Sequence, residues 1–407
     1  PHDRPGGKPE RRHCGQHPAV AFPGGKPVSR TKKKREAPVQ APDELLYWLW
    51  LAKTLGPGSA YAGRVIEEFE DAKGAWIVRK TGEFREAAGE AAFARANRPE
   101  NAPETFRAFT RKCAEKHIQI LPYGDPDYPK ALCCIPDRPL VLYCTGNPQW
   151  LNDQLTVGLI GSRKPTAYGL DVAADMGEAL AKSGVVIASG LADGLDSVGH
   201  NTAVKNSAPT VGVLGVPIDS TYPAANRELR SKIEANGCII SEYAPGSKSI
   251  GPNGFLQRNR LIAALSAAVL VVEAQEKSGT MSTVECAEKY GKKVYAVPGN
   301  IYSPNSVGTN ALIGEGRAAA VYSPANLLSR LGRKMQTAET ETAKAKTEPP
   351  LNDAERKIME YMGPKPIGLE ELRVRTELPT SVLLRTLMNL ELTKRIYRQP
   401  GQRYVLR

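Results

Sequence analysis

The stretch VGLIGSRKPTAYG, residues 157–169, decides the fold of this 407-residue chain. An apolar run that begins at Leu155 ends in Gly161-Ser162-Arg163, and a helical pattern follows at once. A buried strand, a tight turn and a helix start in this order are typical of a strand–helix unit. The amide groups and positive dipole end of such a helix start face whatever binds above the sheet. The sequence therefore predicts an anion site at this turn.

The residue types in the turn narrow the kind of anion. Gly161 allows close approach of a ligand, and the Arg163 guanidinium can hold a phosphate through two hydrogen bonds. A dinucleotide fingerprint, G-x-G-x-x-G, would require glycine at positions 163 and 166, where the chain has Arg163 and Thr166. We therefore expect a phosphate that is not part of NAD, and no cofactor.

The rhythm of the central region predicts an α/β fold. Short apolar runs, typical of strands that are covered on both faces, occur at 155–160, 185–188, 210–214, 238–241, 268–273 and 293–297. Helical patterns occur between or after them at 168–183, 195–205, 224–235, 255–265, 281–290 and 308–314. This alternation predicts a doubly wound, Rossmann-like parallel sheet whose ligands bind at the carboxyl ends of the strands.

The regions on either side predict two further helical domains. Before the sheet, two predicted helices are joined by the segment LGPGSA (55–60). This arrangement resembles a SAM or helix-hairpin-helix bundle, whose hairpin amides would contact DNA. The alternative is a tight αα-corner. After it, three helices and a β-hairpin around Pro400-Gly401 predict a winged helix, which binds either duplex DNA or another protein. The expected domains are a disordered basic tail (1–40), the helical domain (41–118), the Rossmann-like domain (119–332), a linker (333–350) and the winged helix (351–407).

The net charge of +12 is concentrated at the two ends of the chain. Residues 1–40 carry +7 and residues 351–407 carry +4, which leaves the centre nearly neutral. A basic end is either a solvated tail or an attraction for nucleic acid. We expect a cytoplasmic location, since no apolar run approaches the ~20 residues of a membrane span and the N-terminus lacks an apolar signal. The seven scattered cysteines contain no Cys-x-x-Cys pair, so neither zinc nor a disulfide framework is expected.

Polar residues and glycines follow every predicted strand of the centre. Carboxyl ends of parallel strands meet at one edge, so these residues are expected to form a single phosphate-binding site. The candidates are Gly161, Ser162, Arg163, Ser189, Gly190, Asn226, Arg258, Asn259, Arg260, Lys277, Ser278, Gly279 and Thr280. The simplest interpretation of Asp193 and Asp196 is that both cap a helix, and we prefer it for Asp196; His200 is not expected to bind a metal.

Several motifs together resemble one family. GSRKPTAYG, SGLADGLDSVGH, YPAANREL, RNRLIAALS, VEAQEKSGTMST, YAVPGN and GTNALIGEG stand in the order and spacing of the DNA processing protein A family (DprA, also called Smf). LPYGDPDYPKAL at 121–132 is similar to that family's lead-in to its Rossmann domain, and the winged helix fits an optional extension. The resemblance covers residues 43–325.

This resemblance implies a non-enzymatic bacterial protein of natural transformation. Such a protein binds and protects incoming single-stranded DNA, loads the RecA recombinase on it, and forms a homodimer through the Rossmann domain. The GSR, RNR and SGT motifs imply DNA contacts from residues 161–163, 258–260 and 278–280. Asp193, Leu256 and Ala264 depart from the family's usual arginine, proline and glycine, and Asp193 weakens the local positive charge.

Two other functions stay open at this point. SGTMSTVE resembles a degenerate form of the PGGxGTxxE motif of nucleotide phosphoribohydrolases, in which Glu285 and Arg163 would cleave a base from ribose phosphate. Lys277-Ser278 stands in place of that motif's double glycine. The third function is a pure interaction module that recruits proteins through the winged helix.

Overall fold

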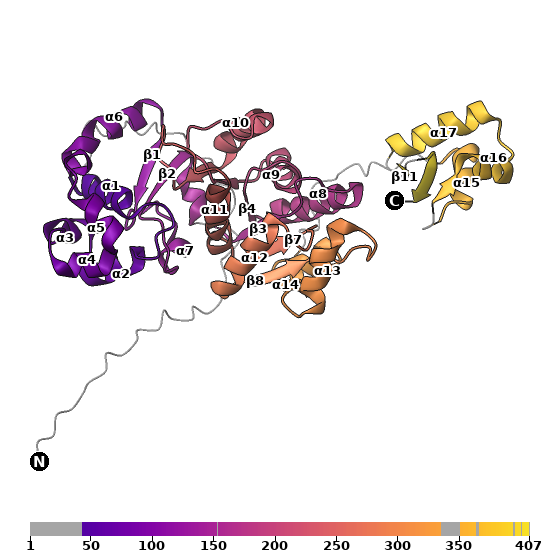
Figure 1. Cartoon of the computed structure of the whole chain (residues 1–407). Helices are drawn as coiled ribbons and strands as arrows, with labels where there is room; N and C mark the ends of the chain where they lie inside the picture. Colours follow the sequence, from indigo (N-terminus) through magenta and orange to yellow (C-terminus); the bar gives the residue numbers. More distant parts are fainter. Residues whose placement is uncertain are drawn as a thin grey trace, which may run out of the picture. The chain divides into compact units, whose positions relative to one another are not determined.

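The computed structural model describes residues 43–152, 154–334, 351–363, 366–393, 395–399 and 401–406. They belong to two compact units, residues 1–336 and 337–407 (Figure 1). The predicted basic tail, 1–40, and most of the predicted linker lie outside the described residues.

The first unit is built on one mixed sheet with the order β1-β2-β6-β5-β4-β3-β7-β8-β9. All pairings from β6 to β9 along this order are parallel, whereas β2 pairs antiparallel with β6 and with β1. The predicted Rossmann-like parallel sheet is confirmed, and an antiparallel pair extends one edge. The strands are β1 (Gln119–Pro122), β2 (Val141–Gly146), β3 (Thr156–Ile160), β4 (Val186–Ser189), β5 (Thr210–Leu214), β6 (Cys238–Ser241), β7 (Ala268–Val271), β8 (Lys293–Ala296) and β9 (Ala319–Ala320).

Helices cover both faces of this sheet because successive side chains of a strand point to opposite sides. Val157 and Leu159 of β3 pack in one core with α8, α9 and α14, while Ile160 packs in the other with α11, α12 and α13. The helices are α8 (Ala167–Lys182), α9 (Leu195–Lys205), α10 (Arg227–Asn236), α11 (Pro252–Leu265), α12 (Gly279–Lys289), α13 (Val307–Gly314) and α14 (Pro324–Arg330).

The strand order reverses at β3. The connection from β3 leads to β4 on one side, whereas β7 lies on the other side, and the helices that follow β3 and β7 cover opposite faces. Such a reversal leaves a crevice at the carboxyl ends of the two strands, where α/β proteins bind their ligands.

A bundle of short helices precedes the sheet and packs around the buried Trp50 and Phe84. Its helices are α1 (Asp43–Leu55), α2 (Ala62–Phe69), α3 (Ala72–Ile77), α4 (Gly82–Ala88), α5 (Glu90–Ala96) and α6 (Arg107–Glu115), and the short α7 (Lys130–Cys133) follows β1. The Gly58 amide of the LGPGSA turn donates to Glu242 Oε1 at 3.0 Å. The turn is therefore anchored to the sheet as an αα-corner, and this amide is not open to DNA.

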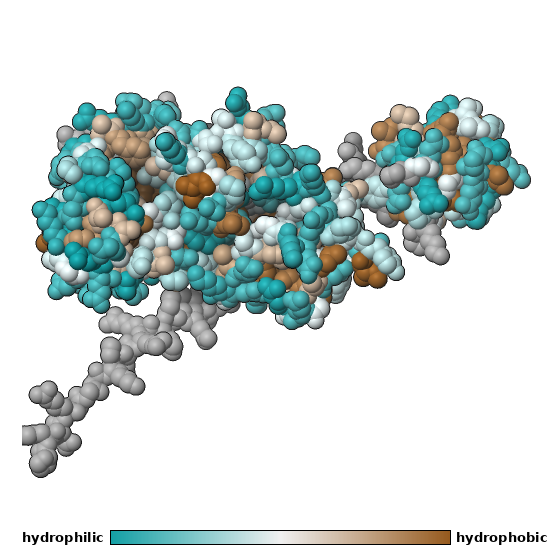
Figure 2. Space-filling view, in the orientation of Figure 1, coloured by the Kyte–Doolittle hydropathy of each residue, from teal (hydrophilic) through white to brown (hydrophobic). Residues whose placement is uncertain are grey.

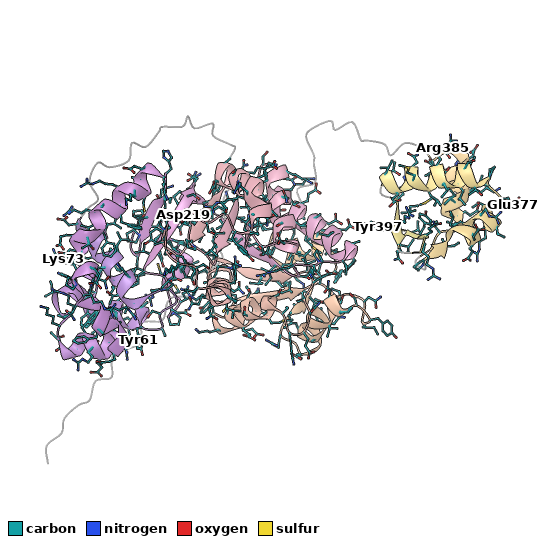
Figure 3. The ribbon with its side chains drawn as sticks, turned by 45° about the horizontal axis from the view of Figure 1, so that its top comes forward. Tyr61, Lys73, Asp219, Glu377, Arg385 and Tyr397 are labelled. Atoms are coloured by element: carbon teal, nitrogen blue, oxygen red, sulfur yellow. The ribbon has the colours of Figure 1, made fainter. Side chains whose placement is uncertain are left out.

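The second unit is a winged helix, as predicted. It contains α15 (Asp353–Glu360), α16 (Leu369–Thr376) and α17 (Thr380–Leu392), with β10 (Ile367–Gly368), β11 (Ile396–Gln399) and β12 (Arg403–Leu406) in the order β10-β12-β11. Arg385 projects from α17 (Figure 3). The same helix exposes Leu384, Met388 and Leu392.

Short 3-10 turns within the described residues lie at Pro99–Asn101, Pro103–Phe106, Pro148–Leu151, Ala224–Asn226 and Pro304–Ser306. Apolar side chains reach the visible surface as separate patches among hydrophilic ones (Figure 2). Among the described residues, no helix has the length and apolar character needed to cross a membrane.

Candidate functional site

A cavity of about 650 Å³ opens where β3 and β7 end. It lies at the crevice that the strand reversal creates, and three segments contribute most of its wall: the turn after β3, the first half of α11 and the start of α12. Its polar and aromatic lining residues are Ser162, Arg163, Lys164, Asp196, Tyr222, Phe255, Arg258, Asn259, Gln275, Ser278, Thr280 and Thr283. The cavity thus joins the GSR, RNR and SGT motifs at one place.

The turn after β3 has a fixed backbone and a free arginine. The carbonyl of Ser162 accepts from Leu195 N at 3.2 Å, and its hydroxyl accepts from Lys164 N at 3.1 Å. Asn305 Nδ2 donates to the carbonyl of Lys164 at 2.8 Å. Arg163 is exposed and has no hydrogen bond or ion pair to any residue that the structure describes. Its five donors are therefore available to a ligand.

The start of α8 differs from the prediction. The helix begins at Ala167, and its N-cap Thr166 accepts from Gly169 N at 3.1 Å. The buried carboxylate of Glu273 accepts from Thr166 N at 3.0 Å and from its hydroxyl at 2.5 Å. The expectation that this helix start faces the ligand with bare amides is therefore wrong, because protein groups already cap it.

Gly161 is required by packing as well as by any ligand. A Cβ there would lie 2.9 Å from the carbonyl oxygen of Glu273 and would overlap the Leu195 side chain. The glycine lets β3 end directly against the segment after β7.

The start of α12 is the open helix terminus of the cavity. Its N-cap Ser278 makes no capping bond, and the Ser278 hydroxyl is buried without a hydrogen-bond partner among the described residues. Thr280 donates to the carbonyl of Gly161 at 3.3 Å, which ties this helix to the turn after β3. First-turn amides of a helix lack internal acceptors, so this end favours an anion.

Arg258 supplies buried positive charge beside the cavity. Its guanidinium donates to the carbonyls of Gly190, at 2.6 Å, and Val213. Burial lowers the pKa of Arg258 to about 10, an effect that the nearby Asp196 opposes, so the group stays charged at neutral pH. Arg258 contributes mainly through its field, since most of its donors are occupied.

Asn259 braces the open helix. Its side-chain amide donates to the carbonyl of Gly279 at 3.1 Å and to the Ser282 hydroxyl at 2.7 Å. These bonds fix the first turn of α12 at the edge of the cavity.

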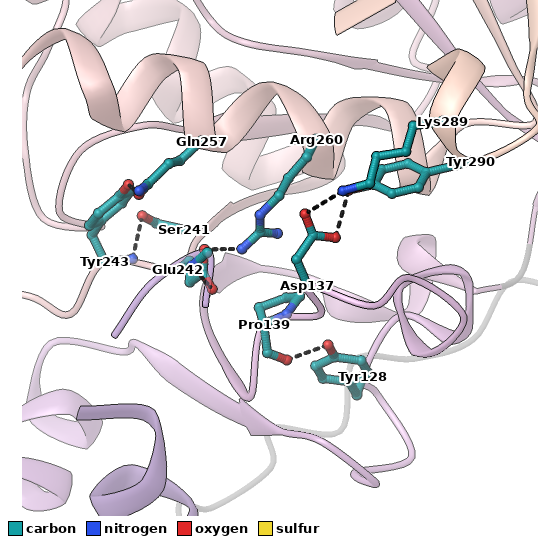
Figure 4. A network of polar contacts seen from close by, with 11 residues as sticks. Tyr128, Asp137, Pro139, Ser241, Glu242, Tyr243, Gln257, Arg260, Lys289 and Tyr290 are labelled. Carbon is teal, nitrogen blue, oxygen red and sulfur yellow. Dashed lines mark hydrogen bonds and ion pairs between the residues drawn. The ribbon is translucent and has the colours of Figure 1, made fainter. Parts of the chain in front are cut away.

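Arg260 points away from the cavity. It is buried and pairs with Glu242 at 2.5 Å, and Asp137 lies on its other side (Figure 4). The pKa of Asp137 is lowered: burial opposes the lowering, but a hydrogen bond from Tyr290 and the charge of Arg260 outweigh it. The structure places Arg260 in an internal charge network and not in the binding surface.

Four further candidates do not line the cavity. Ser189 is fully buried and donates to the carbonyl of Leu159 at 2.6 Å, and the Gly190 amide donates to Asp196 at 3.0 Å. Asn226 donates to the carbonyl of Leu191 and to the Ser197 hydroxyl. Lys277 is exposed just before α12. The first three hold loops in place through bonds within the protein.

The two acids of the second loop do not act as caps. Gly194 is the N-cap of α9 and makes no side-chain cap bond, and Asp196 instead holds the Gly190 amide. Burial raises the pKa of Asp196, against the opposing charge of Arg258. His200 is buried against Thr210, at 2.7 Å, and no metal cluster occurs among the described residues.

Sequence reasoning missed an aromatic pair at the cavity. The rings of Tyr222 and Phe255 lie 5.3 Å apart, and the Arg163 guanidinium lies 5.5 Å from the centre of the Phe255 ring. Tyr222 is 50% exposed. The available signal was the tyrosine that begins YPAANREL and the phenylalanine just before the RNR motif, but only the fold brings them together.

An arginine, an open helix start and an aromatic pair around one cavity combine donors for phosphate with surfaces on which bases stack. The fold and the site together therefore define a Rossmann-like α/β protein with a winged helix and a cavity whose groups suit phosphate and a stacked ring.

Comparisons with known proteins give the family. The model of the family described as DNA recombination-mediator protein A matches residues 119–332, and the DprA winged helix domain matches residues 342–402. The chain belongs to the DNA recombination-mediator protein A family. Protein Smf of Synechocystis is 32% identical over 397 residues, covering 89% of this chain and 99% of that protein.

Two more relatives carry the DprA name. DNA processing protein DprA of Bacillus subtilis is 35% identical over 217 residues, which cover 53% of this chain and 72% of that protein. The X-ray structure of DNA processing protein A from Streptococcus pneumoniae matches with a TM-score of 0.57 and 29% identity, covering 72% of this chain and 98% of that one. The chain is thus a member of a DNA-processing family.

Proposed function

We propose that this protein binds single-stranded DNA in the cavity where β3 and β7 end. The observation that supports this most directly is the free Arg163 beside the Tyr222–Phe255 pair and the open start of α12. A phosphate would bind Arg163 and the amides of residues 278–280, while a base would stack on the exposed ring of Tyr222.

The aromatic pair favours single strands over duplex. Stacking on a protein ring needs a free base face, and in a duplex the neighbouring base pairs cover those faces. Arg163 and the helix start read only phosphate, so we expect little sequence preference.

The family membership and the resemblance of the motifs support the wider role. We propose that the protein protects incoming single-stranded DNA in the cytoplasm and loads RecA on it, in natural transformation or recombination. Residues 119–332 would carry the DNA site, and residues 351–407 would form a separate winged-helix domain.

We further propose a homodimer through the Rossmann-like domain. Two sites on one assembly would hold a long strand better than one, because the second contact gains from a high effective concentration. Light scattering on the full chain at tens of micromolar should give twice the mass of the monomer, and a monomer would contradict the proposal.

Fluorescence anisotropy with labelled oligo-dT and with a duplex of the same length tests the binding. We expect tighter binding to the single strand, and an affinity that falls with salt with a log–log slope of about −0.7 for each phosphate contact. A flat salt response or a preference for duplex would overturn the proposed function.

The geometry of the cavity does not support the alternative function, a phosphoribohydrolase. Glu285 is exposed on α12 and is not among the residues that line the cavity, so it does not face Arg163 across a ligand. We propose that the protein works without catalysis; release of free base from nucleoside monophosphates would contradict this.

A further inference from the structure

A second cleft of about 460 Å³ lies between the helical bundle and the sheet, within the first unit. Helices α1 and α6 and strand β2 form one part of its wall, and the segment from Glu242 to Gln257 forms the other. Nothing in the site described above uses it. Its aromatic and charged lining residues are Lys53, Phe106, Phe109, Arg138, Tyr143, Glu242, Tyr243 and Lys248.

The interior of this cleft is aromatic. Phe106 and Phe109 are partly exposed on its wall, and Phe109 packs edge-on against the buried Tyr143, with ring centres 6.0 Å apart. Tyr243 is fixed by a hydrogen bond to Gln257 at 2.7 Å (Figure 4). The cleft thus offers ring faces that are held in place.

The charge on the cleft is positive. Its one carboxylate, Glu242, forms an ion pair with Arg260 and accepts a hydrogen bond from the amide of Gly58. Lys53 and Lys248 are exposed at the cleft. The Lys53 ammonium lies 5.4 Å from the centre of the Phe106 ring, whereas Lys248 has no partner among the described residues. Aromatic walls with lysines at the rim are the combination by which proteins hold single-stranded nucleic acid.

Helix α11 joins this cleft to the cavity. Ile250 and Gln257 line the cleft, whereas Pro252, Phe255 and Arg258 line the cavity. The two spaces therefore flank the same first turns of α11, about one helix diameter or 10–12 Å apart. A strand bound in the cavity needs only a few more nucleotides to reach the cleft.

We propose that the cleft between the bundle and the sheet is a second subsite for the same DNA strand. It takes bases against Phe106 and Phe109 and phosphates at Lys53 and Lys248, beyond the part of the strand that binds Arg163. This inference rests on the proposed function and extends it, since it gives the helical bundle a part in binding.

The test compares binding of oligo-dT of increasing length to the full chain and to the double variant Lys53→Gln/Lys248→Gln. The wild type should show a step in affinity once the strand is long enough to reach the cleft. The variant should lose that step, about tenfold in affinity, and about 1.4 of the log–log salt slope, with unchanged binding of the shortest strands. Lys73→Gln/Lys80→Gln is the matched control, because both lysines are exposed on the bundle and line neither space; Lys73 is labelled in Figure 3.

A second measurement does not depend on the variants. Strands carrying 4-thiothymidine should crosslink, on irradiation, to a peptide that contains Phe106 and Phe109, and only when they are long. Equal loss at all lengths, no loss, or the same loss in the control would overturn the subsite. If wild type binds no single strand at all, the proposed function fails; if Arg163→Ala weakens binding while the lysine variant matches wild type at every length, only the subsite fails.

Discussion

The turn at 161–163 and the motif at 258–260 both carry arginines near strand ends, yet the structure gives them opposite surroundings. Arg163 is exposed and has no hydrogen bond or ion pair to the described residues; its guanidinium lies only near the Phe255 ring. Arg258 and Arg260 are each only 4% exposed and donate to carbonyls or to a carboxylate. Nε and Nη1 of Arg260 also lack partners among the described residues, but they are buried. The difference teaches that a guanidinium can bind a ligand only where its unpaired donors reach the surface.

The partners of Arg258 and Arg260 explain why these two charged side chains of α11 can be buried. A buried charge is tolerated when it is paired and hydrogen-bonded, and Arg260 has Glu242 at 2.5 Å while Arg258 has two carbonyls. Arg260 also lies between segments that are distant in sequence: it pairs with Glu242, which accepts from Gly58 N of the bundle, and Asp137 lies on its other side (Figure 4). Arg260 therefore stabilises the structure around the cavity without lining it.

The largest expected effect is on stability. Arg260→Ala leaves the Glu242 carboxylate buried without its charged partner, which should lower the free energy of unfolding by about 3–5 kcal/mol. Urea denaturation measures this. A change below about 1 kcal/mol, together with a large loss of DNA affinity, would break the comparison by making Arg260 a ligand contact.

Arg163→Ala should lower DNA affinity and leave stability nearly unchanged, the opposite of Arg260→Ala. Loss of one charge-assisted contact should weaken binding of oligo-dT by about 1.5–3 kcal/mol, while urea denaturation should stay near wild type because the side chain is exposed. Lys73→Ala is a suitable control, since Lys73 is exposed and distant from the cavity lining. Unchanged binding by the arginine variant would move the DNA site elsewhere.

The pH dependence of the free energy of unfolding tests the burial of His200, which lies near Arg258. Burial lowers the pKa of His200 to about 3, helped by the charge of Arg258. The unfolded chain takes up a proton near pH 6.5 and the folded chain does not, so stability should fall by about 2 kcal/mol from pH 7 to pH 5. His200→Asn, which does not titrate, should lose that part of the slope; equal slopes would mean that His200 is accessible.

Removal of residues 351–407 should have the smallest effect on single-strand affinity, less than about 1 kcal/mol. The exposed positions of α17 include Leu384, Met388 and Leu392, which offer no donors to phosphate, and Arg385 is the one basic residue of this helix. Anisotropy with oligo-dT on the truncated chain measures the loss. A loss larger than that of Arg163→Ala would place the main contacts in the winged helix.

Periodicity was enough to predict much of the fold. Thr210–Leu214, Cys238–Ser241 and α9 coincide with the predicted elements, because short apolar runs between helical patterns leave little freedom in a covered sheet. The antiparallel pairing of β2 with β6 depends on which edge strand of the parallel sheet is free. A local sequence pattern cannot predict this.

For the candidate site, the sequence determined which residue types were available: a glycine turn with Arg163, the RNR motif and the SGT turn. Only the tertiary structure decided their roles. It closed the start of α8 with Thr166 and Glu273, buried Arg260 against Glu242, and paired Tyr222 with Phe255. The physical reason is that a polar group binds a ligand only if no protein partner reaches it first, and those partners come from segments tens to more than a hundred residues away in the chain.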